Sequence, residues 1–247
     1  MMSILNKHEN PRVTLLLPVK NEIDGLKKLI PQINSSLFVQ ILMVDGGSTD
    51  GSVEYARQCG IEICFQTRPG LALGIMDSIN YIKGDYIITF SPDGNCPPDI
   101  LPGIIEKFKA GHELVVVSRY LPPARSYDDT LITRFGNYLF TSLIKLIVRR
   151  PMSDALTIYR GYKVQFLKTN FINKFLWGPV LEPLVTIFAS LHQISMVEIP
   201  GDEPPRLGGV RKMKVLSNGF YILVLIFRVY YWRCLLFLRK KNPLSSF

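Results

Sequence analysis

Apolar and polar positions follow two alternating patterns along the first half of the chain. Short apolar runs, typical of buried strands, occur at residues 12–18, 40–45, 61–65, 85–90 and 114–118. Between these runs, apolar residues recur at helical spacing in residues 22–33, 53–59, 70–82 and 98–110. Strands and helices that alternate in this way form βαβ units, so the pattern predicts an α/β fold with a mostly parallel sheet.

The alternation stops after Ser118. Helical spacing then appears in residues 134–150 and 179–192, and a short strand is predicted at 196–200. A basic, glycine-bearing loop at 206–214 leads into a long apolar helix, rich in aromatic residues, at 217–239. The pattern therefore predicts a helix-rich part after the α/β part.

Polar side chains stand where three of the predicted strands end. Asn21 and Glu22 follow the first strand, Asp45 ends the second, and Asp93 and Asn95 follow the fourth. Ligands of open α/β sheets bind at the carboxyl ends of the strands, so we expect these groups to share one cleft. Each group also has a local structural interpretation, as a helix N-cap or a turn residue.

The stretch GGSTDGS after Asp45 is neither a dinucleotide-binding fingerprint nor a P-loop. Its glycines allow a ligand to approach the backbone, and Ser48 or Asp50 can cap the following helix. Dehydrogenase and P-loop kinase functions therefore lose support.

Composition narrows the class of protein further. The chain has 247 residues, 47% of them hydrophobic, and a net charge of +9, which predicts an anionic partner such as nucleic acid, a phosphate-bearing ligand or acidic lipid. Its four cysteines form no C-x-x-C pair, which is typical of reduced thiols in the cytosol. The N-terminus has no apolar core of a secretory signal. No helix-turn-helix or aromatic-interleaved basic pattern occurs, so a nucleic-acid partner is not expected.

Four blocks, VTLLLPVKNE, ILMVDGGSTDGS, GDYIITFSPDGNCPPD and VVVSRY, resemble the family-2 glycosyltransferases in order and spacing. Within that family the chain is most similar to polyprenol-phosphate sugar transferases such as the dolichol-phosphate mannosyltransferases. The resemblance spans roughly residues 13–212 and implies a GT-A fold, a Rossmann-like α/β architecture. It also implies transfer of a sugar, with inversion, from a GDP- or UDP-linked donor to a polyprenyl phosphate.

The resemblance assigns roles to particular residues. The residues that it places on the nucleotide sugar are Pro18, Asn21, Glu22, Asp45, Gly70, Asp77, Asp93, Arg206 and Lys212. Among these, Asp45 would meet the base, Asp93 the metal and diphosphate, and Arg206 would close over the donor. Arg119 and Arg134 would meet the acceptor phosphate.

The chain departs from the family's metal-binding stretch. The family has two aspartates flanking one residue, then a glutamine; here these positions are Ser91, Asp93 and Asn95. Mg²⁺ and similar hard cations favour carboxylates but tolerate waters and substrate phosphates as ligands. We therefore expect Mg²⁺ or Mn²⁺ to be held weakly by Asp93 and Asn95, or to be dispensable, with Arg206 and Lys212 supplying charge.

A catalytic base is needed for a sugar hydroxyl acceptor but not for a phosphate, which is already ionised near neutral pH. Asp154 and Glu182 are the candidates for this role, or for orienting the acceptor. Their structural alternatives are a loop cap for Asp154 and a polar helix face for Glu182.

The segment 219–238 is about long enough to span a bilayer, but Arg228 and Arg233 lie within it. Two arginines cost about 5–7 kcal/mol of insertion free energy, and about a dozen apolar residues return about 4–7 kcal/mol. Tyrosines, a tryptophan and the basic tail 239–241 favour a helix lying in the membrane interface, with residues 138–150 as a second contact. The alternative is a helix packed on the catalytic domain or in a homo-oligomer.

Together these features predict a GT-A domain at 1–214, with a nucleotide-sugar half at 12–120 and an acceptor half at 121–214. Residues 215–247 would form a membrane-associating segment on the cytoplasmic face, peripheral or interfacially anchored. Extension of a lipid-linked or polysaccharide glycan is the alternative function. More remote alternatives are a basic nucleic-acid-binding protein and an inactive scaffold.

Overall fold

The computed structural model describes residues 10–207 and 215–241. Among these residues, seven strands form one sheet in the order β3-β2-β1-β4-β6-β5-β7. The strands are β1 (Val13–Val19), β2 (Gln40–Asp45), β3 (Glu62–Phe65), β4 (Tyr86–Thr89), β5 (Leu114–Ser118), β6 (Arg160–Lys163) and β7 (Met196–Pro200). β6 is antiparallel to both neighbours, and the other pairs are parallel. The predicted α/β class is confirmed, but β6 was not predicted, because its four residues include two charged residues and a glycine rather than an apolar run.

The described α-helices agree with the predicted segments in position more than in length, except that the helix at residues 170–175 was not predicted. They are α1 (Ile23–Leu29), α2 (Ser52–Gln58), α3 (Leu71–Asp77), α4 (Leu101–Lys109), α5 (Leu131–Val148), α6 (Asn170–Phe175), α7 (Leu181–Leu191) and α8 (Val215–Lys241). Short 3₁₀ helices take over where α1 and α3 were expected to continue, at Ile30–Gln32 and Ser78–Tyr81. α5 begins three residues before its predicted start, because Thr130 and Thr133 form a capping box there.

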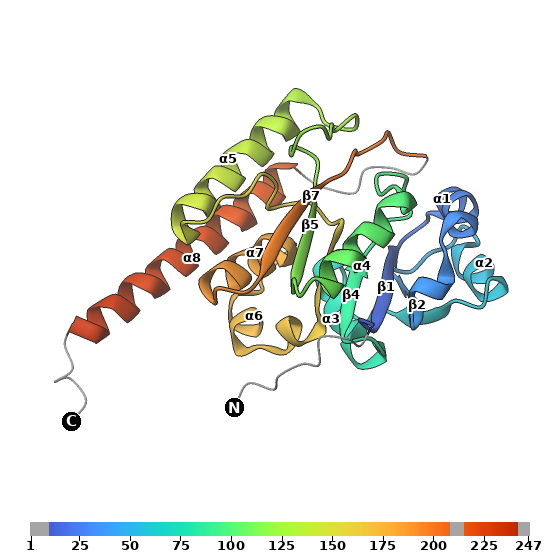
Figure 1. Ribbon diagram of the computed structural model, residues 1–247, viewed down its shortest axis with the longest axis horizontal. Coiled ribbons are helices and arrows are strands. Elements are labelled where there is room, and N and C mark those ends of the chain that lie inside the picture. The colour runs from blue at the N-terminus through green and yellow to red at the C-terminus, as the bar shows by residue number, and fades with distance from the viewer. Residues whose placement is uncertain (1–9, 208–214, 242–247) are drawn as a thin grey trace.

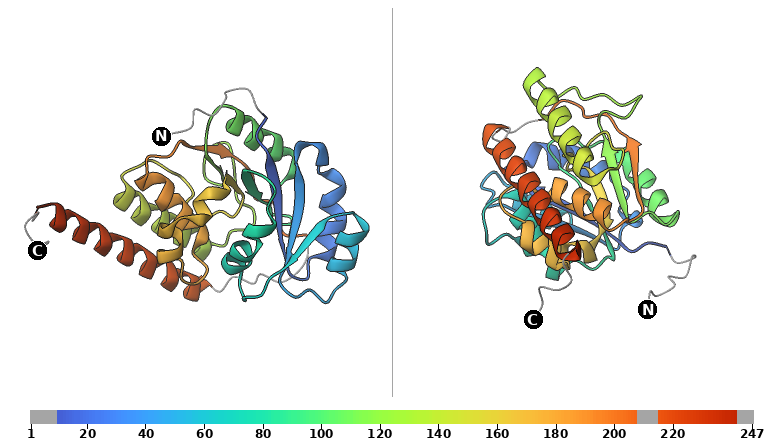
Figure 2. Two further views of the ribbon diagram at one scale, coloured as in Figure 1. Left: turned by 90° about the horizontal axis from the view of Figure 1, so that it is seen from below. Right: turned by 90° about the vertical axis from the view of Figure 1, so that its left-hand side faces the viewer.

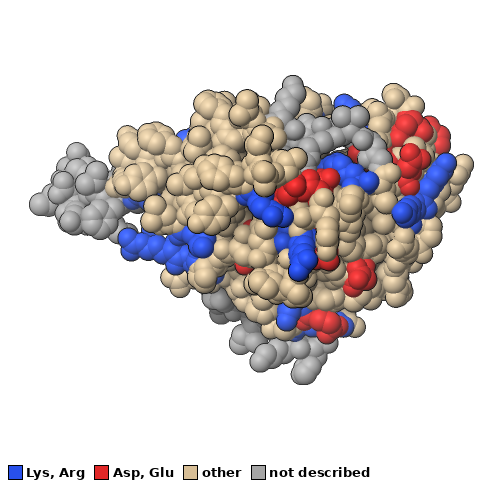
Figure 3. Space-filling view, turned by 90° about the horizontal axis from the view of Figure 1, so that it is seen from above, with Lys and Arg blue, Asp and Glu red and all other residues tan. Residues whose placement is uncertain are grey.

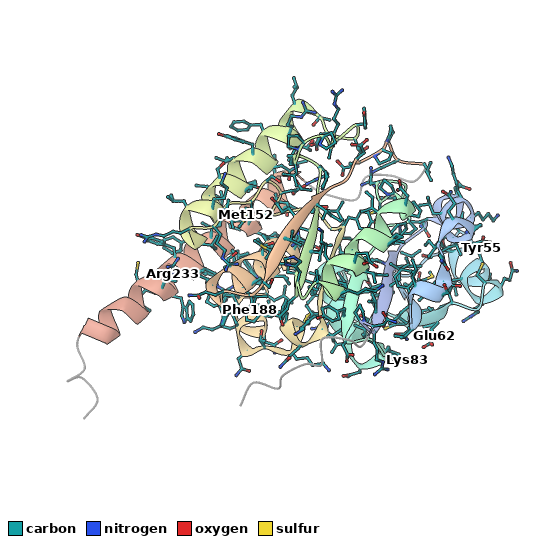
Figure 4. All side chains as sticks on the ribbon, in the orientation of Figure 1. Tyr55, Glu62, Lys83, Met152, Phe188 and Arg233 are labelled. Atoms are coloured by element: carbon teal, nitrogen blue, oxygen red, sulfur yellow. The ribbon has the colours of Figure 1, made fainter. Side chains whose placement is uncertain are left out.

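Two hydrophobic cores lie on the two faces of the sheet (Figure 1). One contains α1, α2 and α4, and the other contains α3 and α5 to α8. Side chains along a strand alternate between the cores: Leu15 and Leu17 of β1 belong to the first and Leu16 to the second. Met152 and Phe188, labelled in Figure 4, are buried in the second core.

α5 and α8 lie side by side at one end of the molecule, and α8 projects beyond the other elements (Figures 1 and 2). Ile222, Leu225 and Val229 of α8 are buried in the second core. The Arg233 guanidinium, labelled in Figure 4, donates to the carbonyl of Ile147 near the end of α5. This arginine therefore has a protein partner on α5.

Candidate active site

The loops that follow β1 and β2 are joined by reciprocal hydrogen bonds. The Asn21 backbone N–H donates to Ser48 Oγ (3.0 Å), and Asn21 Oδ1 accepts from the Thr49 backbone N–H (2.8 Å). Asn21 therefore does not cap α1, whose N-cap residue is Glu22 and whose N-terminus has no side-chain capping hydrogen bond. The two loops instead form a single surface at the carboxyl end of the sheet.

Asp50 strengthens the same junction. Its Oδ2 accepts from the Ile23 backbone N–H (3.0 Å), and its Oδ1 accepts from the N–H of Ser52 (3.0 Å), at the start of α2. Burial alone would raise the pKa of the Asp50 carboxyl, but these hydrogen bonds and that of the Ser52 hydroxyl lower it. The negative charge thus holds the starts of two helices together.

Asp45 is buried at the end of β2, directly beside Val19 of β1. Its Oδ2 accepts from the Gly47 N–H (2.9 Å) and its Oδ1 from the Ser48 N–H (3.1 Å). Pro18, next to Val44 in the register, is half-buried at the same sheet edge. Asp45 thus has a structural role in its turn, and contact with a base stays a prediction.

Asp77, at the end of α3, holds the loop that precedes this helix. Its Oδ2 accepts from the Thr67 N–H (2.8 Å), and its Oδ1 pairs with the Arg68 guanidinium (2.6 Å). Burial acts to raise the pKa of the Asp77 carboxyl, but these hydrogen bonds outweigh it and lower the pKa. Gly70 adopts φ +104°, a conformation that favours glycine, just before the helix begins.

The turn after β4 lies against the start of the chain's first helix. A Cβ placed on Gly25 of α1 would come within 1.8 Å of the Pro92 carbonyl oxygen and 3.6 Å of Asp93 Cα. The turn is therefore in direct contact with α1, and this contact requires glycine. The predicted meeting of the β1, β2 and β4 ends at one edge of the sheet is thus observed.

Asp93 itself is buried and already has two partners. Its Oδ1 accepts from the Asn95 N–H (3.1 Å), and its Oδ2 pairs with Arg206 Nη1 (2.8 Å). Asn95 Nδ2 donates to the Pro204 carbonyl (2.7 Å), so only the amide oxygen of Asn95 remains as a metal donor. The described residues contain no group of three histidine, cysteine or acidic side chains that could hold a metal ion. One carboxylate paired with a guanidinium does not fit a tightly bound divalent cation.

Arg119, directly after β5, is largely buried, and its contact with the acceptor phosphate stays a prediction. Its guanidinium pairs with Asp154, which is 1% exposed, and its Nη1 also contacts Glu203 Oε1 (3.2 Å). Burial opposes ionisation of Asp154, but Arg119 outweighs this and lowers the carboxyl's pKa. Burial raises the pKa of Glu203. Asp154 thus holds Arg119, and a role as catalytic base stays a prediction.

Glu182 stands in the first turn of α7, close to the fully buried Arg160 of β6. Burial raises the pKa of its carboxyl, and the charge of Arg160 partly offsets this. The Arg160 side chain donates to the Glu182 carbonyl (2.8 Å) and to Thr186 Oγ1 (2.9 Å). Arg160 thereby joins β6 to α7.

The two remaining predicted residues differ in what the structure shows. Arg134 is exposed in the first turn of α5, and its side chain makes no hydrogen bond or ion pair within the described part of the chain. Lys212 lies outside the described residues. Sequence reasoning missed Glu203, Asp128 and Arg160, which lie in segments without periodicity and are paired with residues far away in the sequence. The only available signal for Glu203 was its position three residues before Arg206.

Comparisons with known proteins identify the class. The model of glycosyl transferase family 2 matches residues 14–171, and the chain belongs to this family. A similar relative is an undecaprenyl-phosphate 4-deoxy-4-formamido-L-arabinose transferase of Edwardsiella ictaluri, 26% identical over 226 residues, which cover 86% of this chain and 66% of the relative. Glycosyltransferase AglJ of Haloferax volcanii is 24% identical over 220 residues, covering 87% of this chain and 71% of AglJ. The chain thus spans about two thirds of the length of these relatives.

Solved structures confirm the GT-A-like fold. Glucosyl-3-phosphoglycerate synthase from Mycobacterium tuberculosis, in complex with Mn²⁺, UDP and phosphoglyceric acid, superposes with a TM-score of 0.66 at 17% identity. The match covers 87% of this chain and 76% of the synthase. Its complex with Mn²⁺, UDP-glucose and phosphoglyceric acid gives a TM-score of 0.65 at 19% identity, over 87% of this chain and 77% of the synthase. At this identity the likeness shows the fold alone.

Proposed function

We propose that this chain transfers a sugar, with inversion, from a GDP- or UDP-linked donor to a polyprenyl phosphate at the cytoplasmic face of a membrane. The observation that carries the proposal is that two largely exposed apolar helices, α5 and α8, lie side by side. α5 begins just after Asp128, which pairs with Arg206 next to Asp93. α5 follows the loop that leaves the carboxyl end of β5, and Asn137 Nδ2 of α5 donates to Tyr120 Oη in that loop (2.8 Å). A lipid-phase acceptor could thus reach the site along α5.

The two helices have the surface expected of a membrane contact. α5 and the Val215–Leu235 part of α8 are long and apolar enough to cross a bilayer, yet only 28% and 22% of these segments is buried. Figure 3 shows a broad area without charged side chains at the end where these helices lie. Large apolar patches of this kind mark sites of membrane or protein contact. We propose that α5 and α8 lie in the membrane interface, with residues 215–247 as the associating segment of a 1–214 catalytic domain.

The chemistry follows from the acceptor. A phosphate oxygen of the polyprenyl phosphate attacks the anomeric carbon of the sugar, and the bond from that carbon to the diphosphate breaks, releasing the nucleoside diphosphate. No proton has to leave the acceptor, because it is already ionised. The absence of a required base agrees with the structure, because the Asp154 carboxylate is paired with Arg119 inside the protein. We therefore assign Asp154 and Glu182 a role in positioning neighbouring side chains rather than in taking up a proton. Arg134, exposed at the start of α5, is the proposed contact for the acceptor phosphate.

Donor binding is proposed at the joined ends of β1, β2 and β4. Asn21, Asp45 and Asp93 lie there, and relatives of this fold bind UDP with Mn²⁺ at their own sites. Here a Mg²⁺ or Mn²⁺ ion would have only the Asp93 carboxylate and the Asn95 amide oxygen, so we propose that it is held weakly.

A transfer assay tests the proposal. The protein, in detergent or with vesicles, is given labelled UDP- and GDP-sugars and a short polyprenyl phosphate, and labelled lipid is extracted. Asp93→Ala should reduce transfer by about 100-fold or more, because it removes the carboxylate that holds the Arg206 guanidinium at the proposed diphosphate site. The matched control is Asp99→Ala, which removes an exposed carboxylate from the next helical turn. Sugar added to a glycan hydroxyl, with none on the polyprenyl phosphate, would instead favour glycan extension.

A further inference from the structure

Arg206 occupies the position of a cation between two carboxylates. Its Nη1 is 2.8 Å from Asp93 Oδ2, and its Nε is 3.5 Å from Asp128 Oδ2. Both acidic side chains are largely buried, with 8% and 16% of their surface exposed. A positive charge that belongs to the protein therefore lies directly next to Asp93.

The backbone on both sides of Arg206 is fixed to the turn after β4. The Leu207 N–H donates to the Asp93 carbonyl (2.8 Å), and the Pro204 carbonyl accepts from Asn95 Nδ2 (2.7 Å). Gly94 adopts φ +102°, and a Cβ there would come within 2.6 Å of the Leu207 side chain. The segment thus packs on the turn without space for a larger residue.

The N-terminal side of Arg206 is fixed as well. Glu203 contacts Arg119 (3.2 Å) and accepts from the Ser126 hydroxyl, and Asp202 Oδ1 accepts from the Arg125 N–H (2.8 Å). Residues 202–207 are therefore anchored at both ends, and the Arg206 guanidinium is held in place rather than free at the surface. A preorganised charge of this kind costs no reorganisation during reaction.

The same arrangement disfavours a divalent cation. Position 91 is a serine, Asp93 Oδ2 is already paired with Arg206, and the Asn95 amide nitrogen is used as a donor. A dication at Asp93 would lie beside the Arg206 guanidinium and be repelled by it. The Nε of Arg206 is buried and has no hydrogen-bond acceptor among the described residues, so the protein alone does not satisfy this guanidinium.

We propose that Arg206 takes over the role of the metal ion, and that sugar transfer by this chain does not require a divalent cation. This inference rests on the proposed glycosyltransferase function. The planar guanidinium can donate paired hydrogen bonds to the donor's diphosphate and stabilise the negative charge that the leaving nucleoside diphosphate gains as the anomeric bond breaks. The acceptor oxygen forms the new bond to the anomeric carbon as the bond from that carbon to the diphosphate breaks. No proton is transferred, and no group is oxidised or reduced.

The test compares four proteins with and without metal: the natural chain, Arg206→Ala, Arg206→Ala combined with Ser91→Asp, and the control Arg125→Ala. Arg125 is an exposed arginine of the neighbouring loop, so its removal changes net charge equally. Transfer is measured after treatment with EDTA and again with added Mn²⁺. Direct binding of Mn²⁺ is measured in parallel from the electron paramagnetic resonance signal of free Mn²⁺, with and without UDP or GDP.

The natural chain and Arg125→Ala should keep transfer within about twofold in EDTA and bind Mn²⁺ weakly. The rate of metal-free transfer by Arg206→Ala should be about 100-fold lower than that of the natural chain, as expected for removal of a preorganised charge. Adding Ser91→Asp to this variant should create a tighter Mn²⁺ site and restore transfer only with Mn²⁺. Folding of each variant is checked by its melting temperature.

Transfer by the natural chain that EDTA abolishes and Mn²⁺ restores would overturn the inference but leave the proposed function intact. Metal-free transfer unaffected in Arg206→Ala would overturn it too. If no transfer is seen with any donor, the proposed function fails, and the Mn²⁺ measurements still decide the inference about the site. Tight binding of Mn²⁺ by the natural chain would overturn the inference, because a site that Arg206 occupies should bind the ion weakly.

Discussion

The Arg119 guanidinium and the Asp154 carboxylate form a two-pronged ion pair inside the protein. Arg119 Nε is 2.6 Å from Asp154 Oδ2, and Nη2 is 3.0 Å from Oδ1. The same guanidinium reaches Glu203, so one buried cation connects the end of β5 with the segment that carries Arg206. The pair therefore contributes both to stability and to the geometry of the site.

Removing one partner should destabilise the fold strongly. Asp154→Ala would leave Arg119 buried with Glu203 alone, and breaking such a pair typically costs about 3–5 kcal/mol of unfolding free energy. The measurement is urea unfolding followed by circular dichroism. Glu106→Ala, which breaks the exposed pair with Lys109 on α4, serves as control and should cost less than about 1 kcal/mol. An Asp154→Ala protein as stable as the control variant would contradict the structural role.

The lowered pKa of the Asp77 carboxyl predicts that the stability of the fold depends on pH. Because the pKa of its carboxyl is lowered in the folded state, the unfolded chain takes up a proton first as pH falls. The stabilisation is therefore fully present above the unfolded pKa of about 3.9 and is lost as pH falls through the folded pKa. Asp77→Asn should lower stability at pH 6, and its difference from the natural chain should shrink below about pH 4.

Urea unfolding at a series of pH values measures this difference. Asp99→Asn, at an exposed position in the 3₁₀ helix Pro98–Ile100, is the control. A difference for Asp77→Asn that stays constant between pH 7 and pH 3 would show that its charge has no role in holding the loop before α3.

Gly25 should tolerate no side chain. A Cβ at this position would lie 1.8 Å from the Pro92 carbonyl oxygen, so Gly25→Ala must displace α1 or the turn that carries Asp93. We expect a loss of about 1–3 kcal/mol of unfolding free energy, together with weaker nucleotide binding. Calorimetric titration with UDP and GDP and urea unfolding measure the two effects.

Gly103→Ala is the control, and we expect it not to lower the free energy of unfolding. It lies in α4, and a Cβ there would meet Ile199 only at 3.9 Å, an ordinary contact. Alanine is up to about 1 kcal/mol better than glycine within a helix, so this variant should be as stable as the natural chain or more so. Equal behaviour of the two variants would show that the contact between α1 and the turn is loose.

How much could be predicted from sequence depended on whether the signal was local. The strands and helices before Tyr120 have regular apolar periodicity, and they were found within a few residues. β6 has no such pattern, and its buried Arg160 is stabilised by the Glu182 carbonyl and the Thr186 hydroxyl, which only the fold brings near. The resemblance placed Asp93 and Arg206 on one donor site, but their direct pairing across the chain required the structure.

The last prediction concerns the apolar surface of α5 and α8. Large hydrophobic side chains that are exposed on these helices are Leu131, Ile132, Phe135, Tyr138, Leu139, Leu146, Val215, Leu216, Phe220, Leu223, Phe227, Tyr230, Tyr231 and Leu235. Deleting α8 is a poor test, because Ile222, Leu225 and Val229 belong to the core and their loss would expose it. Exposed side chains can instead be exchanged without disturbing the core.

The variant is Leu216→Ser with Phe227→Ser, positions that are 90% and 68% exposed. If these side chains enter the membrane interface, burial of each contributes about 1.5–3 kcal/mol, and their loss should weaken vesicle binding by about 10-fold or more. The control is Val39→Ser with Tyr81→Ser, also exposed apolar residues but far from both helices in the sequence, and it should bind as the natural chain does.

Co-sedimentation with vesicles of anionic and neutral lipid gives the measurement, and light scattering gives the mass of each protein in solution. Binding to anionic vesicles should also weaken with salt, because the basic residues Arg239, Lys240 and Lys241 follow the apolar part of α8. Unchanged sedimentation of the Leu216 and Phe227 variant, together with conversion of an oligomer to a monomer, would assign the two helices to a contact between copies of the chain instead of to the membrane.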